Sequence, residues 1–146
     1  MVDFVSLMYG QSGLMTASGP RLRGVQWTRL ANEDLLDASG FPTGSGWEEV
    51  ELTLTDDRQA YIVELDVDVA PPMFRRGDML VVSPGSGLRR GDRVLLRLRQ
   101  GPIQVGVLNR RSAQRLTLAD PAGREAERTI AAADVAWLAR IVWLSQ

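Results

Sequence analysis

The side chains that most often carry out covalent and acid–base catalysis are missing from this 146-residue chain. It contains no cysteine, histidine or lysine, and all 17 of its basic residues are arginine. A Ser-His-Asp triad, a Cys-His dyad, a Ser-Lys dyad and a Schiff base are therefore excluded. Zinc sites built from cysteine and histidine are excluded as well. Only carboxylate chemistry, or a Mg²⁺ or Ca²⁺ site with oxygen ligands, is left.

Two stretches could supply such chemistry, and for both we favour a structural interpretation. Asp66 and Asp68 lie two positions apart and could hold a hard cation, but a solvated polar strand face explains them better. The loop "PGSGLRRGD" could cradle a phosphate with the help of Arg89 and Arg90. It lacks the usual lysine of such loops, so we interpret it as a tight connection between strands. We expect no metal and no cofactor.

Alternation of apolar and polar residues predicts a mainly β, mostly antiparallel fold. "EVELTL" alternates, and "QAYIVELDVDV" alternates without a break as far as Val69. Four more short strands follow between Gly, Pro and Asp turns: "DMLVVS", "DRVLLRLR", "PIQVGVL" and "QRLTLA". "ARIVWLS" closes the set after a helical turn at "IAAADV", with one helix over "AAADVAWLARIVW" as a minor alternative.

The N-terminal third differs in composition from the rest of the chain. Residues 1–46 are rich in Gly, Ser and Thr with weak periodicity, which predicts a long irregular arm or linker. A short helical turn at "NEDLLDA" capped by Asn32 is the one element expected there. Residues 47–146 are expected to form one compact domain, long enough to bury an ordinary core.

Charge and hydropathy set the expected surroundings of the protein. The formal net charge is −1, so there is no bulk electrostatic case for nucleic acid or acidic membranes, and we expect no direct DNA binding. The start of the chain lacks the pattern of a signal peptide, and no apolar run is long enough for a membrane span. We therefore expect a cytoplasmic location.

The stretch "VELDVDVAPPMFRRGD" resembles the active-site motif of the LexA/phage-repressor/UmuD family of self-cleaving peptidases. That motif runs Gly-Asp-Ser-Met-x-Pro, four residues, then Gly-Asp. Asp68, Pro72, Gly77 and Asp78 match it at the right spacing, whereas Val69 stands in place of the nucleophilic serine. Val67 and Ala70 replace the Gly and the Met.

Further segments resemble the same family in the same order, over about residues 40–146, and most closely its alphaproteobacterial phage-type repressors. "GFPTGSGWEEVEL" resembles the approach to the first core strand, and "VVSPGSGLRRGDRVLLR" resembles the second Gly-Asp hairpin, with Gly91 and Asp92. "QVGVLNRRSAQRLTL" lies where the family carries its general-base lysine, and the matching residue is Gly106. "ERTIAAADVAWLARIVWLSQ" resembles the C-terminal end.

The resemblance implies a LexA C-terminal-domain-like, signal-peptidase-like β fold that has lost its catalytic activity. In the family, the dyad cuts an Ala-Gly or Cys-Gly bond in the protein's own arm, and the corresponding segment "QWTRLANEDLL" contains neither. Val69 extends the apolar alternation and is expected to pack in the core. Gly106, inside a strand, is expected to mark a bulge or a close approach of the backbone. The arm is expected either to pack permanently at the old dyad or to leave a cleft for another ligand.

The family also implies a function in transcription control and the SOS response without chemistry. Its domains dimerise, often by pairing C-terminal strands, and we expect a homodimer through an edge strand that contains Arg140, Ile141, Val142, Trp143 and Leu144. Our first hypothesis is a non-catalytic regulatory and dimerisation module. The alternatives are a UmuD-like adaptor that binds a polymerase or another partner, and a decoy subunit that forms mixed dimers with an active repressor.

Overall fold

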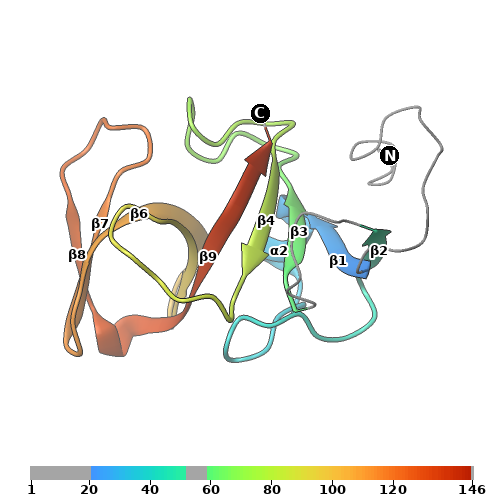
Figure 1. Ribbon diagram of the computed structural model, residues 1–146, viewed down its shortest axis with the longest axis horizontal. Helices are drawn as coiled ribbons and strands as arrows, with labels where there is room; N and C mark the ends of the chain where they lie inside the picture. The colour runs from blue at the N-terminus through green and yellow to red at the C-terminus, as the bar shows by residue number, and fades with distance from the viewer. Residues whose placement is uncertain (1–20, 52–58, 146) are drawn as a thin grey trace.

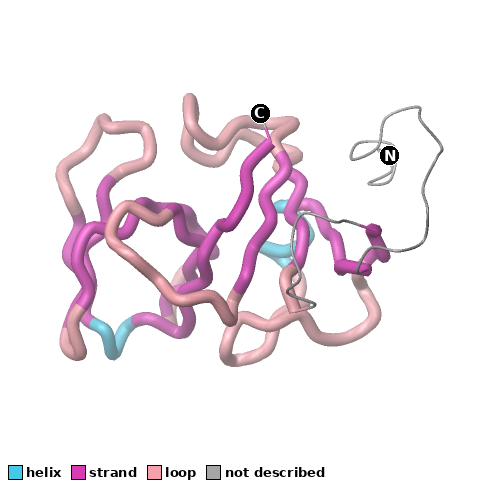
Figure 2. Tube along the Cα trace, viewed as in Figure 1, coloured by secondary structure: helices cyan, strands magenta, loops and turns pink. Residues whose placement is uncertain are grey.

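The computed structural model describes residues 21–51 and 59–145, and within these ranges strands dominate (Figures 1 and 2). The strands are β1 (Arg21–Gln26), β2 (Glu48–Glu51), β3 (Tyr61–Glu64), β4 (Met79–Ser83), β5 (Arg93–Leu98), β6 (Ile103–Arg111), β7 (Arg115–Ala119), β8 (Arg128–Ala131) and β9 (Val135–Ser145). The helical elements are short, namely α2 (Trp27–Asn32) and the 3₁₀ turn η1 (Ala132–Asp134).

All of these strands belong to one sheet in the order β2-β1-β3-β4-β9-β5-β6-β7-β8. The β1–β3 pair is parallel, and every other neighbouring pair is antiparallel. The predicted class, mainly β and mostly antiparallel, is therefore confirmed. Neighbours in sequence pair directly from β5 to β8, because short turns can only connect antiparallel strands.

Strand β9 joins the two halves of this sheet. Its C-terminal half pairs with β4, from Ser83–Arg140 to Met79–Ser145, and its N-terminal half pairs with β5, from Val94–Arg140 to Leu98–Val135. A register shift interrupts each pairing, with Ala136 and Val142 as the extra residues. Bulges bend and twist a strand, so β9 can pass from one half to the other, as Figure 1 shows.

The main core lies between the two halves of the sheet. Side chains of β1, β3 and β4, including Val25, Val63 and Leu80, meet Leu95 of β5 and Trp137 of β9. A second apolar cluster lies between the other face of β5 and the strands β6, β7 and β8. Its buried members are Val94, Leu96, Leu108, Leu116, Leu118 and Ile130. Burial on both faces explains why β5 reads as a nearly continuous apolar run.

The structure corrects the predicted end of the third strand. β3 ends at Glu64, and the alternating residues as far as Val69 form bends and turns rather than a strand. Val67, which the alternation placed on the core face, has 40% of its surface exposed. The acidic positions of the alternation do not face solvent on a strand: Asp66 accepts from Thr28 of α2, and Asp68 accepts from the Arg76 backbone in the same loop.

The predicted arm also needs correction where it is described. Residues 21–26 form β1 inside the sheet, so the boundary at residue 46 does not separate an irregular arm from the β domain. The expected helical turn at "NEDLLDA" is wrong, because α2 lies upstream and Asn32 ends it instead of capping its start. The linker-like stretch "GQSGLMTASGP" falls outside the described residues.

The C-terminal region contains one strand more than predicted. β8 was not anticipated; it pairs with β7 from Arg115–Ala131 to Leu118–Arg128. The helical alternative over "AAADVAWLARIVW" is wrong, because only η1 is helical and β9 follows it directly. Across residues 21–51 and 59–145, no helix combines the length and the apolar character needed to cross a membrane.

Candidate functional site

The segment between β3 and β4 is a closed loop whose ends are tied by backbone hydrogen bonds. The Leu65 N–H donates to the Asp78 carbonyl (2.8 Å), and the Gly77 N–H donates to the Leu65 carbonyl (2.7 Å). Within the loop, Ala70 and the fully buried Phe74 exchange backbone hydrogen bonds at 3.0 Å. The loop that carries the motif-like residues is therefore closed by its own backbone hydrogen bonds.

The matched acidic residues of the motif hold this loop in shape. Asp68 Oδ1 accepts the Arg76 N–H (2.8 Å), and Asp78 Oδ2 accepts the Arg75 N–H (2.9 Å). Pro72 lies exposed at the tip of the loop. Asp68 and Asp78 thus have a structural role that needs no catalysis.

A cavity of about 370 Å³ lies beside this loop, and we call it the dyad cleft. Val69 and Ala70 line one side, while Ile103–Gly106 of β6 and Leu118–Ala119 of β7 line another. Trp27 of α2 closes a further side. Val69 and Gly106, which the resemblance places at the positions of serine and lysine, therefore line one and the same cleft.

Neither of these two residues can act as nucleophile or base, and both are fitted to their surroundings. Val69 is half-buried and packs against the main core. A Cβ added to Gly106 would lie 3.3 Å from Leu118 Cδ1 and 3.5 Å from Leu118 Cβ. The expected close approach at Gly106 therefore involves a side chain. The alternative of a bulge there is wrong, because the register shift of β6 falls between Leu108 and Arg110.

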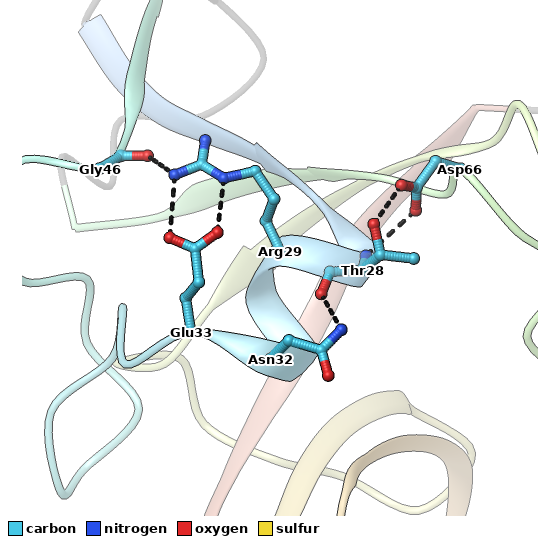
Figure 3. Close-up of polar contacts among 6 residues, drawn as sticks. All are labelled: Thr28, Arg29, Asn32, Glu33, Gly46 and Asp66. Carbon is cyan, nitrogen blue, oxygen red and sulfur yellow. Dashed lines mark hydrogen bonds and ion pairs between the residues drawn. The ribbon is translucent and has the colours of Figure 1, made fainter.

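The segment that would carry a scissile bond is folded against this cleft. Its first residues form α2, and Trp27 is buried where it lines the cleft. The Thr28 N–H donates to Asp66 Oδ1 (3.1 Å), and the Thr28 hydroxyl donates to the other carboxylate oxygen (Figure 3). Because the residue before the helix provides no side-chain cap, Asp66 satisfies an N–H of the first turn from outside.

Arg29 fixes the other side of the same helix. Its guanidinium donates to Glu33 Oε2 (2.9 Å) and to the Gly46 carbonyl (2.8 Å), as Figure 3 shows. Asn32 donates to the Thr28 carbonyl (2.7 Å), so the last turn is closed as well. These contacts hold residues 27–33 in place beside the cleft, and a peptide bond held in a helix is not presented as an extended substrate.

The rim of the dyad cleft is polar but already engaged in structural contacts. Asp120 accepts the N–H groups of Ala122 (3.1 Å), Arg124 (2.9 Å) and Glu125 (3.0 Å), and these bonds lower the pKa of its carboxyl. Arg128 donates to Gln104 Oε1 (2.6 Å). Asp120 is therefore an ionised loop anchor, which leaves it a poor proton acceptor.

The acidic pair considered for a cation serves other purposes. Asp66 binds Thr28 and Asp68 binds the Arg76 backbone, so the two carboxylates point to different partners. In the part of the chain that the structure describes, no group of three or more acidic side chains is placed to hold a metal ion. "PGSGLRRGD" connects β4 to β5 without opening a helix.

The predicted interface residues, Arg140 to Leu144, lie in the C-terminal half of β9. This strand is not an edge of the whole sheet as expected, because it lies between β4 and β5. The pairing with β5 nevertheless stops at Arg140, so from Ile141 onward one side of the strand has no strand partner among the described residues. Val142, the bulged residue on this segment, has 36% of its surface exposed.

Sequence reasoning missed Trp27, and it missed the role of Asp66, which it considered only as a cation ligand or as part of a polar strand face. The available signal for Trp27 was its spacing of three from Leu30, both apolar in a polar arm, which is typical of one helix face. Nothing local marked Asp66 as a cap for a helix 38 positions upstream. In comparisons with known proteins, the chain matches no protein-family model and no curated protein.

Proposed function

We propose that the protein is a non-catalytic regulatory and dimerisation module in transcription control, built on a LexA/phage-repressor-like peptidase fold that has lost its dyad. The observation that carries the proposal is the dyad cleft. Valine and glycine face it at the two positions where the resemblance requires serine and lysine, and the chain has no lysine at all. The loop and strands around these positions remain well packed.

The docked helix supports the absence of self-cleavage independently of the dyad. Residues 27–32 are helical and are held by Asp66 and by the Arg29 contacts. A peptidase cleft of this kind needs an extended chain across it, and here Trp27 occupies part of the wall. Residues 27–33 therefore act as a permanent part of the domain. A function in transcription control places the protein in the cytoplasm.

Dimerisation through the C-terminal half of β9 is the second part of the proposal. An antiparallel partner strand on the open side of Ile141–Ser145 would extend the sheet around a two-fold axis. Val142 is an extra residue of β9 opposite β4, so the backbone of β9 is locally bent and twisted there. This bend limits which strands can pair with the open side of β9. A second copy carries the same bulge and can match it symmetrically.

Sedimentation equilibrium of two matched variants tests this interface. Val142→Lys places like charges near each other across the two-fold axis, and Val67→Lys alters the other exposed valine, at 40% exposure compared with 36%. We expect the wild type and Val67→Lys to have twice the monomer mass, and Val142→Lys to be a monomer with an unchanged circular-dichroism spectrum. Equal masses for the two folded variants would contradict this interface.

The same open strand supports one alternative, a decoy subunit that forms mixed dimers with an active repressor. Such a partner would present a matching C-terminal strand. Co-expression of the two chains followed by native mass spectrometry separates the cases. Homodimers alone favour the first proposal, and a mixed dimer as the main species favours the decoy.

A further inference from the structure

The hairpin formed by β6 and β7 carries three arginines close to its tip. Arg110, Arg111 and Arg115 are all exposed. Among the residues that the structure describes, their guanidinium groups make no ion pair or hydrogen bond. Arg29, Arg128 and Arg140, by contrast, each contact a named partner. The hairpin therefore exposes three unneutralised positive charges.

Hydroxyl groups lie beside these arginines in an open groove. Arg110 of β6 pairs with Thr117 of β7, which in turn pairs with Thr129 of β8, so the three residues form a row across three strands. They line a groove of about 750 Å³. Glu127 is the one acidic residue of its lining, and Asn109 donates to it. The groove thus combines arginine guanidinium groups with hydroxyl groups, and both kinds of group donate hydrogen bonds to phosphate oxygens.

The arginines are separated from the acidic part of the molecule. Figure 1 shows β6, β7 and β8 at one end of the long axis and β1 and β2 at the other. β2 carries Glu48, Glu49 and Glu51. The three arginines therefore lie far from these glutamates, and a net charge of −1 does not prevent local attraction of a polyanion to the hairpin.

We propose that the β6–β7 hairpin binds the phosphodiester backbone of duplex DNA. The major groove of B-form DNA admits a two-stranded β-ribbon, whereas that of A-form RNA is too narrow. The lining of the groove contains no aromatic side chain, so it offers no stacking platform for single strands. Contacts limited to phosphates make the binding independent of sequence and sensitive to salt. This proposal is opposed to the expectation, drawn from net charge, that the chain does not contact DNA, and the binding experiment decides between them.

Fluorescence anisotropy with a labelled 20-base-pair duplex tests the proposal on the full chain. Three neutralised phosphates give a salt slope of about −2.7, so we expect affinity to fall about 40-fold between 50 and 200 mM salt. The variant R110Q/R111Q/R115Q should weaken binding at 50 mM salt at least tenfold. Each single substitution should reduce the salt slope by about one.

The matched control is R23Q/R75Q/R76Q, which removes the same charge from exposed arginines of β1 and of the loop before β4. We expect it to bind within about twofold of the wild type, because its arginines lie outside the hairpin. Equal loss in both triple variants would overturn the proposal, as would no binding by the wild type at 50 mM salt. Equal or tighter binding of a single-stranded 20-mer or of a phosphoserine peptide would overturn the choice of duplex DNA.

Discussion

The tetrapeptide Arg-Arg-Gly-Asp occurs at residues 75–78 and again at 89–92, and the two copies form the same turn. In the first, the Arg75 N–H donates to Asp78 Oδ2 (2.9 Å), and in the second the Arg89 N–H donates to Asp92 Oδ2 (2.7 Å). Each turn then binds a leucine through two backbone hydrogen bonds of 2.7–2.8 Å; the partner is Leu65, just after β3, in the first and Leu108 of β6 in the second. Local chemistry alone therefore builds the turn.

The surroundings of the two turns differ. Asp78 is only 4% exposed and closes the loop that forms a wall of the dyad cleft. Asp92 is half-buried and lies 3.5 Å from Arg140 in a partly exposed ion pair. The same four residues thus support a cleft in one place and a plain hairpin in the other. The Arg-Arg-Gly-Asp sequence therefore specifies a turn, and it does not by itself specify a site.

Replacement of the turn aspartates should have the largest and most unequal effect. Asp78→Ala removes a buried carboxylate and the acceptor of the Arg75 N–H in a partly buried hydrogen bond, and we expect it to cost about 3 kcal/mol. Asp92→Ala removes a similar hydrogen bond and a screened ion pair near the surface, for about 1 kcal/mol. Urea unfolding of both variants measures the difference. Equal losses would mean that the two turns are energetically equivalent.

Replacement of the turn glycines should have a smaller and equal effect. Gly77 and Gly91 have φ of 95° and 91°, and an added Cβ would meet nothing within 4 Å at either position. Alanine should therefore lower the free energy of unfolding only through the strain of the left-handed backbone, by about 1–2 kcal/mol at each position. The same urea experiment applies. A gap above about 1 kcal/mol between Gly77→Ala and Gly91→Ala would show that the turns differ in backbone as well as in environment.

A change in pH should act on the neighbourhood of the first turn. Glu64 comes directly before the leucine that binds that turn, whereas Val107 holds the equivalent place beside the second. Burial raises the pKa of the Glu64 carboxyl, with smaller contributions from Asp66 and Glu48. The pKa of Glu64 is therefore higher in the folded protein than in the unfolded chain. Its contribution to the free energy of unfolding is fully present below the unfolded pKa and is lost as the pH rises through the folded pKa.

Glu64→Gln should remove that loss. We expect the variant to melt a few degrees above the wild type at pH 7 and to gain much less at pH 4, where Glu64 is largely protonated in the folded wild type. Differential scanning calorimetry at the two pH values measures this. A gain that is the same at both would assign the effect to something other than ionisation.

The sequence was most informative where structure depends on neighbouring residues. The strands β4 to β7 and the Gly-Asp turns between them follow from apolar runs and turn residues close together in the chain. The end of β3 could not be predicted, because the role of Asp66 depends on Thr28, 38 positions away. β8 is only four residues long and is fixed by its pairing with β7.

The candidate site was predictable only in part. Periodicity alone does not bring Val69 and Gly106 to one cleft, and the resemblance to self-cleaving peptidases was needed to pair them. Trp27 lies in the cleft because β1 runs parallel to β3, and a parallel pairing between distant segments has no local signature. The basic groove also depends on β8, which the alternation did not reveal.

The most direct test of the central claim, that the fold is kept and the chemistry is lost, is the intact mass of the full chain after incubation with an activated RecA filament. An active repressor of the LexA type, incubated in parallel, serves as the positive control. We expect the control to be cut and this chain to keep its full mass, since Val69 and Gly106 offer neither nucleophile nor base. A specific cut within residues 26–36 would contradict the account.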